Sequence, residues 1–177
     1  MASGSNGAST SEEPLPVRSR LILQQCLSAK LMVQPRTDTQ EEQFVEIGRG
    51  LIIYICFFRG ATEDMVEKMV KAALTACLSE SETGKLVSVL DLPGDVLIIP
   101  QATLGGSLKG KRMQYHRNIN KEDGYNLYSK FAKLCDIYVT GAPKCREQQK
   151  VVRAGTYGNR QVFSTQTNGP YTHYLEF

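Results

Sequence analysis

The 177-residue sequence contains no tryptophan, only two histidines and no long apolar run. Its longest apolar stretch, residues 51–58, is far shorter than the roughly 20 residues that cross a bilayer. The Ser- and Gly-rich amino end has neither the basic region nor the apolar region of a signal peptide. These absences predict a soluble protein with no membrane partner.

Metal-binding and disulfide patterns are also missing. His116 and His173 lie in no metal-ligand spacing, no Cys-x-x-Cys pair occurs, and there is no Asn-x-Ser/Thr sequon. The five cysteines are irregularly spaced and four lie in apolar-patterned segments, which is typical of buried free thiols in a reducing compartment. The sequence therefore favours a cytoplasmic protein with no metal and no cofactor. A cysteine–histidine hydrolase stays open, because such partners meet in space rather than in sequence.

The length and apolar content predict one domain. A chain with 41% hydrophobic residues can bury one core, but it is too short for two full domains. Residues 1–17 are Ser, Gly, Glu and Pro with almost nothing to bury, so they are predicted to be a disordered tail. The folded domain is predicted to span residues 18–177.

Hydrophobic patterning predicts an α+β fold dominated by strands, with barrel-like curved sheets and two main helices. Helical spacing covers residues 62–78, with Thr62 as the N-cap, and residues 121–135, with Asn120 as the cap. Two long strands are predicted over 21–33 and 43–58, the second bent at Gly48 or Gly50. Shorter strands are predicted over residues 85–90, 95–99, 151–153, 161–165 and 171–177.

Positive charge is concentrated in one part of the chain. Residues 105–160 hold 12 Lys and Arg against 4 Asp and Glu, whereas the rest of the chain holds 9 against 14. Such a segment attracts a polyanion if its side chains share a face, although a solvated face of scattered lysines explains the charge equally well.

A glycine-rich motif falls inside this basic segment. Residues 105–112 nearly fit the phosphate-binding pattern G-x-x-x-x-G-K-[ST], but Arg112 stands where the pattern needs a hydroxyl to hold magnesium. The residues that follow are also a poor start for a helix, which excludes a nucleotide site of this kind. Lys109, Lys111 and Arg112 remain as a basic loop suited to a nucleic-acid backbone.

Two short segments present backbone polar groups at strand ends. Gln101, Ala102 and Thr103 follow a strand that Pro100 ends, so their N–H groups can face a ligand oxyanion; an ordinary strand-to-loop transition is the alternative. Near the carboxyl end, Gly169-Pro170 fits a common turn. Its peptide bond can be cis or trans at a difference of about 0.5–1 kcal/mol, so it can aim two carbonyls in either of two directions.

Together these segments resemble the D-aminoacyl-tRNA deacylase family. Its members carry Ser-Gln-Phe-Thr-Leu and, near the carboxyl end, Asn-Asp-Gly-Pro-Val-Thr; this chain has Pro-Gln-Ala-Thr-Leu over residues 100–104 and Thr-Asn-Gly-Pro-Tyr-Thr over residues 167–172. Gly-Thr-Tyr-Gly over residues 155–158 is similar to the family's Gly-x-Phe-Gly element. The resemblance runs from about residue 18 to residue 177.

Three departures resemble the animal-specific branch of that family: Pro100 replaces serine, Ala102 replaces phenylalanine, and Gln25 stands where the typical branch has arginine. In the typical branch a cis Gly-Pro enters the partner subunit's pocket and excludes L-amino acids. In the animal branch the motif is trans and the pocket is wider. The resemblance therefore implies a homodimer that removes D-amino acids from tRNA and also L-alanine misattached to tRNA(Thr).

The resemblance also implies roles for individual residues. The N–H groups of Ala102 and Thr103 would stabilise the oxyanion and Gln101 would shape the site, while the 2′-hydroxyl of the terminal adenosine of the aminoacyl-tRNA would help to activate water. Asn168, Gly169 and Pro170 would form the chiral gate, Gln25 would border a roomier pocket, and the basic loop at Lys109, Lys111 and Arg112 would hold phosphates. The competing hypothesis is a non-catalytic RNA- or tRNA-binding protein.

Overall fold

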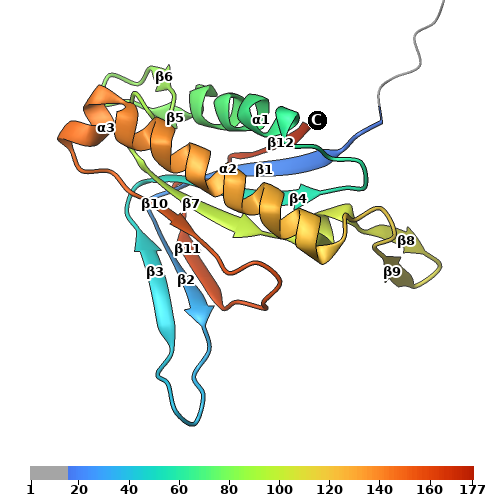
Figure 1. The fold of residues 1–177 in the computed structure, drawn as a ribbon. Helices are drawn as coiled ribbons and strands as arrows, with labels where there is room; N and C mark the ends of the chain where they lie inside the picture. Colours follow the sequence, from blue (N-terminus) through green and yellow to red (C-terminus); the bar gives the residue numbers. More distant parts are fainter. Residues whose placement is uncertain (1–15) are drawn as a thin grey trace, which may run out of the picture.

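A five-stranded sheet lies at the centre of the computed structural model, which describes residues 16–177 (Figure 1). Strand β1 (Ser19–Cys26) is antiparallel to both β4 (Gly50–Phe57) and β12 (Thr172–Glu176). Strand β7 (Asp95–Pro100) is parallel to β4 and to β10 (Val152–Ala154). The order across the sheet is therefore β10-β7-β4-β1-β12.

Helices cover one face of this sheet, because each parallel pair needs a crossover connection. Helix α1 (Asp64–Thr75) connects β4 to β7, and α2 (Lys121–Gly141) with the short α3 (Pro143–Glu147) connects β7 to β10. Val66 and Phe131 from the helices pack on the same core as Leu21, Ile53 and Ile98 from the sheet. The two predicted main helices are confirmed; α3 was not predicted, because its five residues are too few to show a period.

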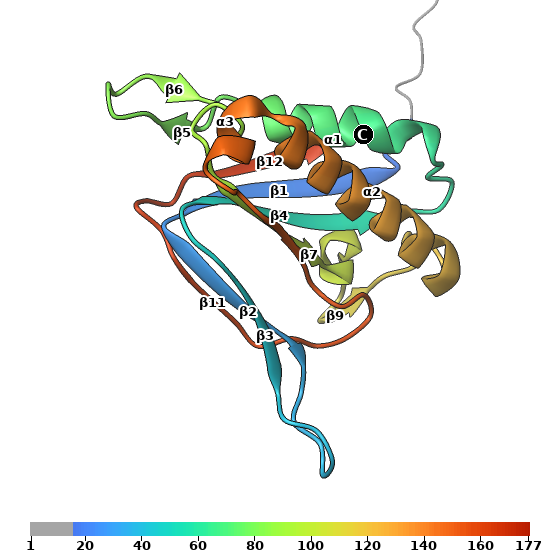
Figure 2. The ribbon, with the colours of Figure 1, turned by 60° about the vertical axis from the view of Figure 1, so that its left-hand side comes forward.

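A smaller sheet packs on the opposite face of the central one. It has the order β11 (Phe163–Gln166), β2 (Ser28–Gln34), β3 (Gln43–Ile47). Leu31 and Ile47 from this sheet form a second core with Ile52 and Leu97 from the central sheet. Strands β4 and β7 are thus buried on both faces, between a helical layer and a sheet (Figure 2).

The two sheets share bent strands. The predicted strand over residues 21–33 is broken at Leu27 into β1 and β2, and the strand over 43–58 is broken at Gly48 and Arg49, where a bend was expected. Gly50 is needed at this junction, since a Cβ atom there would lie 1.9 Å from the Asp95 carbonyl oxygen. The prediction of barrel-like sheets is wrong: the described sheets do not close, because β10 and β12 remain edges of the central sheet.

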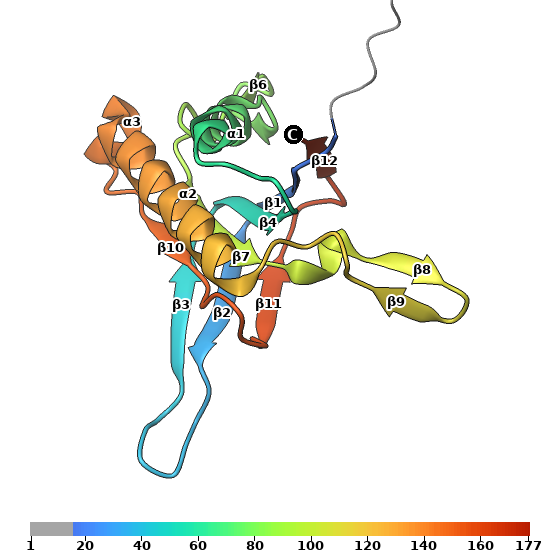
Figure 3. The same cartoon turned by 45° about the vertical axis from the view of Figure 1, so that its right-hand side comes forward.

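Two small ribbons complete the described chain. Strands β5 (Ser79–Glu80) and β6 (Leu86–Val87) form one, and β8 (Ser107–Lys109) and β9 (Arg112–Gln114) form the other, which projects from the body in Figure 3. The strand predicted over 85–90 is reduced to β6, because a turn follows in which the Leu92 N–H donates to the Ser88 carbonyl.

Local details of the sequence prediction hold in part. Asn120 caps α2 by accepting a hydrogen bond from the Asp123 N–H at 2.9 Å. Thr62 is not the N-cap of α1, because Glu63 occupies that position, and the helix ends at Thr75, which leaves Cys77 exposed. The other four cysteines are free and buried.

The predicted tail of residues 1–17 lies outside the described residues except for its last two positions. Among the helices within residues 16–177, none has the combination of length and apolar character required to cross a membrane.

Two aliphatic side chains of α2 test this packing. Leu127 is 4% exposed and Ile137 is 53% exposed. We expect Leu127→Ala to lower the free energy of unfolding by about 2–5 kcal/mol, because it opens a cavity in the core. Ile137→Ala, the matched control, is expected to change it by less than about 0.5 kcal/mol. Urea denaturation measures both; equal losses would contradict the assigned burial of the two faces of α2.

Candidate functional site

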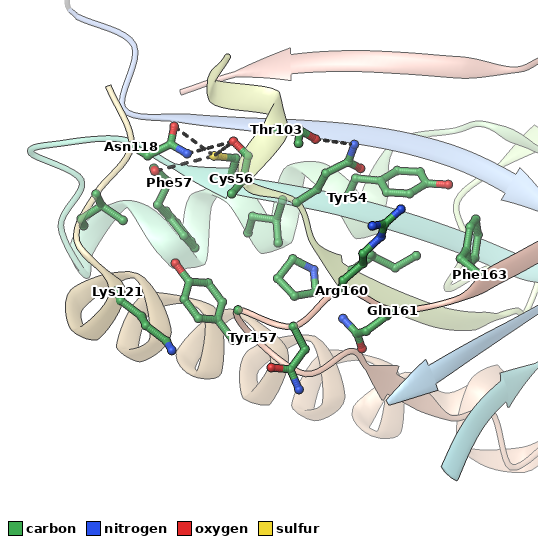
Figure 4. Close-up of a pocket in the computed structure, with 18 of the residues that line it drawn as sticks. Tyr54, Cys56, Phe57, Thr103, Asn118, Lys121, Tyr157, Arg160, Gln161 and Phe163 are labelled. Carbon is green, nitrogen blue, oxygen red and sulfur yellow. Dashed lines mark hydrogen bonds between the residues drawn. The ribbon is translucent and has the colours of Figure 1, made fainter. Parts of the chain in front are cut away.

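A cavity of about 810 Å³ opens where the carboxyl ends of β4 and β7 meet the amino end of α2 (Figure 4). The described residues that line it include two cations, Lys121 and Arg160, but no histidine, aspartate or glutamate. Tyr54, Tyr157 and Phe163 supply aromatic surface. The cavity is therefore suited to a largely apolar ligand that carries a negatively charged or polar group.

Gln101, Ala102 and Thr103 all line this cavity. The Gln101 N–H donates to the Ile55 carbonyl at 2.9 Å, after which the chain leaves the sheet and forms the 3₁₀ helix η1 (Ala102–Gly105). Within residues 16–177, no hydrogen bond joins the N–H of Ala102 or Thr103 to an acceptor. The Gln101 side chain makes no capping hydrogen bond to them, and its Nε2 donates to the Thr103 hydroxyl at 3.0 Å. Both amides are left available.

Asn118 holds the first turn of η1 in place. Its Nδ2 donates to the Ala102 carbonyl at 2.9 Å, and the segment is positioned by a β-bridge between Phe58 and Asn118. Gly105 makes the contact possible, since a Cβ atom there would lie 1.7 Å from Asn118 Oδ1. Sequence reasoning missed Asn118, because no local pattern shows that it returns to residue 102 across a hairpin.

A second loop, residues 155–161, forms the other wall of the cavity. The Tyr128 hydroxyl donates to the Gly155 carbonyl at 2.7 Å, and the Gln161 side chain both accepts from the Thr156 N–H and donates to the Thr156 carbonyl. Tyr157 packs against Tyr128, and burial raises its pKa, so its phenol is neutral. The Gly-Thr-Tyr-Gly element is thus fixed to the core and places Tyr157 in the lining.

Cys56 also lines the cavity, which bears on the hypothesis of a cysteine hydrolase. Its Sγ lies 3.7 Å from the Ala102 carbonyl and 3.9 Å from Asn118 Oδ1, both of which are acceptors. Burial raises the pKa of the Cys56 thiol to about 11. Neither histidine lines the cavity, His116 being exposed and His173 lying in β12. The surroundings keep the thiol protonated, which disfavours a thiolate nucleophile.

The Gly-Pro segment and Gln25 do not line this cavity. Gln25 is buried and pairs with Leu51 at the start of β4, whereas Cys56 lies five residues further along that strand. At about 3.3 Å per residue, Leu51 and Cys56 are about 16 Å apart along β4. Within one chain, the structure therefore does not bring Gln25, Asn168, Gly169 or Pro170 together with Gln101 to Thr103.

Local hydrogen bonds hold the Gly-Pro turn. The Gly169 carbonyl accepts from the Tyr171 N–H at 2.9 Å and the Pro170 carbonyl accepts from the Thr172 N–H at 3.1 Å. Gln24 contacts the turn from β1, since its Nε2 lies 3.5 Å from the Gly169 oxygen and its Oε1 accepts from the Thr172 hydroxyl. The Gly169–Pro170 bond is trans, Leu92–Pro93 being the one cis peptide bond of residues 16–177.

Lys109, Lys111 and Arg112 are exposed on the β8–β9 ribbon. None of the three forms an ion pair with a carboxylate of the described chain. The ribbon leaves the body at the end of η1 and returns to Asn118, so it connects two segments that line the cavity.

A family model described as D-Tyr-tRNA(Tyr) deacylase matches residues 22–176. The chain belongs to the D-aminoacyl-tRNA deacylase family. It is 59% identical to D-aminoacyl-tRNA deacylase 2 of Gallus gallus, over 92% of this chain and 97% of that protein. It is 55% identical to D-aminoacyl-tRNA deacylase 2 of Homo sapiens, over 90% of this chain and 95% of that protein. These matches confirm the resemblance to the family and to its animal members.

Solved structures of similar proteins share the fold. A probable eukaryotic D-amino acid tRNA deacylase superposes with a TM-score of 0.71 at 27% identity, covering 90% of this chain and 99% of that chain. The c-Myc DNA Unwinding Element Binding Protein gives a TM-score of 0.73 at 24% identity, covering 89% of this chain and 98% of that chain. This match shows a likeness of fold alone. Within residues 16–177, no group of three or more His, Cys, Asp or Glu side chains is placed to hold a metal ion.

The state of Cys56 can be tested with iodoacetamide. With a pKa of about 11, only about one thiol in a thousand is ionised at pH 8, so we expect Cys56 to stay unmodified while exposed Cys77 reacts. Peptide mass spectrometry measures both sites, and urea-unfolded protein provides the control in which both react. Modification of Cys56 at pH 8 as fast as that of Cys77 would contradict the protonated thiol.

Proposed function

We propose that this protein hydrolyses the ester between an amino acid and the terminal adenosine of tRNA, acting on D-amino acids and on L-alanine misattached to tRNA(Thr). Membership of the deacylase family supports the reaction class. The observation that carries the proposal for this chain is the pair of unpartnered N–H groups of Ala102 and Thr103 at the cavity wall. The buried free cysteines are consistent with a reducing, cytoplasmic setting.

The two amides would act as an oxyanion hole. An aminoacyl ester develops negative charge on its carbonyl oxygen during attack by water, and preorganised N–H donors stabilise that charge. Each such donor contributes about 2.7–4 kcal/mol. Two donors are therefore enough for a rate gain of about a thousandfold or more. Gln101 shapes the turn through its hydrogen bond to the Thr103 hydroxyl.

The lining supports a mechanism without an attacking side chain. Among the described lining residues there is no histidine or carboxylate to serve as a general base, and Cys56 is protonated. The 2′-hydroxyl of the terminal ribose would instead help to activate the water. The neutral phenol of Tyr157 and the other aromatic side chains would exclude bulk water from the ester.

The gate would come from a second copy of the chain. Within one chain, Gly169 and Pro170 do not line the cavity, and their carbonyls accept local hydrogen bonds in a trans turn that Asn168 precedes. In a two-fold dimer the turn of one subunit could face the cavity of its partner. A trans turn leaves more room at the amino acid than a turn whose carbonyls point into the cavity, which fits acceptance of a small L-residue. Gln25, which stands where the typical branch has arginine, fits the same acceptance.

The main alternative is a protein that binds tRNA without cleaving it, which the exposed cations Lys109, Lys111 and Arg112 would also support. Incubation with D-tyrosyl-tRNA and with L-alanyl-tRNA(Thr) separates the two functions: a deacylase releases the amino acid, whereas a binder protects the ester. Correctly charged L-threonyl-tRNA(Thr) serves as the control substrate. Protection of all three esters would overturn the proposal.

Substitutions at Thr103 test the role of the backbone. Thr103→Ser keeps the hydroxyl and the N–H, Thr103→Ala keeps only the N–H, and Thr103→Pro removes the N–H without breaking a described internal hydrogen bond. We expect the kcat of Thr103→Ser and Thr103→Ala to stay within about tenfold of the wild-type value, and that of Thr103→Pro to fall about 100-fold or more. Loss of turnover in folded Thr103→Ala would point to a side-chain nucleophile instead.

The anchoring role of Asn118 gives a second test. Asn118→Asp replaces the Nδ2 donor by an oxygen that repels the Ala102 carbonyl, so η1 should shift and kcat should fall about tenfold to a hundredfold. Asn126→Asp, at an exposed position of α2, is the matched control and is expected to retain full turnover. Single-turnover release of the amino acid measures both; equal activity of the two variants would contradict the anchoring role.

A further inference from the structure

The β8–β9 ribbon has two chemically different faces. Leu108 pairs with Met113 and Lys109 pairs with Arg112, so strand alternation puts the apolar pair and the cationic pair on opposite sides. Tyr115 lies with the apolar pair: a Cβ atom on Gly106 would come within 2.6 Å of Met113 Cε and 2.9 Å of Tyr115 Cε1. The "apolar face" of the ribbon is thus formed by Leu108, Met113 and Tyr115.

This apolar face is open to solvent. Leu108 is 70% exposed, Met113 49% and Tyr115 42%. The ribbon forms a two-stranded sheet of its own and extends away from the body, as Figure 3 shows. An isolated hairpin is marginal in water, and clustered apolar side chains on an exposed element indicate an interaction surface.

The charge around the apolar face selects the partner. Residues 101–121 contain five cations and no carboxylate. A second copy that met this ribbon with its own ribbon would bring the same cations together, whereas a nucleic acid would neutralise them. Apolar and aromatic side chains next to such cations suit unpaired nucleotides, because base faces are accessible only outside a duplex.

The position of the ribbon matches this partner. It is inserted between Thr103 and Asn118, two residues of the cavity lining. With the ester of the terminal adenosine in the cavity, a ribbon that stands at its rim is within reach of the unpaired nucleotides that precede this adenosine. Strands β8 and β9 reach about 10 Å from the rim at 3.3 Å per residue, which is enough to contact the exposed bases.

We propose that the apolar face of the β8–β9 ribbon holds the single-stranded 3′ end of tRNA, with Leu108, Met113 and Tyr115 against base faces and the surrounding cations of residues 101–121 attracting its phosphates. The inference rests on the proposed function, which supplies tRNA as the ligand, and it assigns the ribbon to the unpaired end rather than to the duplex stem. The contribution of the apolar face does not depend on base identity, since every base has a π-face.

Binding of uncharged tRNA tests this assignment. The affinity of full-length tRNA is compared with that of the same tRNA lacking its unpaired 3′ nucleotides, for the wild type and for Leu108→Ser/Met113→Ser. The double variant is expected to bind full-length tRNA about tenfold more weakly and to bind truncated tRNA as the wild type does. Leu86→Ser is the matched control, because Leu86 is a 54% exposed leucine on the other two-stranded ribbon.

Three other outcomes overturn the assignment. Equal losses for both tRNAs would place the contact on the duplex, and unchanged binding of both would remove the ribbon from the interface. A change of oligomeric state in the variant, measured by sedimentation, would make the apolar face a contact between subunits. If the double variant melts early, Leu108→Ser alone repeats the comparison. Failure of the wild type to release amino acids would overturn the proposed function without affecting this binding result.

Discussion

The hydrogen bond from Asn118 Nδ2 to the Ala102 carbonyl, 2.9 Å long, fixes the point at which the chain leaves the central sheet. Strand β7 ends at Pro100, the Gln101 N–H makes the last bond to β4, and η1 then turns the chain away. The amides of Ala102 and Thr103 are free because the first N–H groups of a helix have no acceptor inside it, and Asn118 holds the turn that presents them. The candidate site depends on this arrangement.

The three-layer fold gives this turn a rigid support. Strands β4 and β7 are buried between the helices and the smaller sheet, so the ends from which the lining residues come cannot easily move. Tyr128 extends the same support to the opposite wall, since its hydroxyl binds the Gly155 and Ile98 carbonyls. The proposed oxyanion hole of backbone amides needs such support, because the strength of such a hole depends on preorganised geometry.

Local chemistry made several features predictable. The helical period showed α1 and α2, Asn120 identified the cap of α2, and Pro100 marked the end of β7. The bend at Gly48 and Arg49 was predictable because glycine interrupts the apolar run, whereas the break at Leu27 was not, because leucine continues it. Thr62 failed as a cap because the helix begins one residue later than its pattern suggests, a common shift at helix ends.

The sequence by itself determined the class of the protein: the spacing of apolar residues specified an α+β chain, and the segments at residues 100–104 and 167–172 specified the family, because both are local properties. Tertiary structure alone decided which groups meet. It placed Cys56, Asn118 and Tyr157 in one cavity with Thr103, and it separated the Gly-Pro turn from that cavity within a single chain. The reason is physical: these contacts cross sheet registers and hairpins, and strand pairing rather than local propensity sets which distant residues become neighbours.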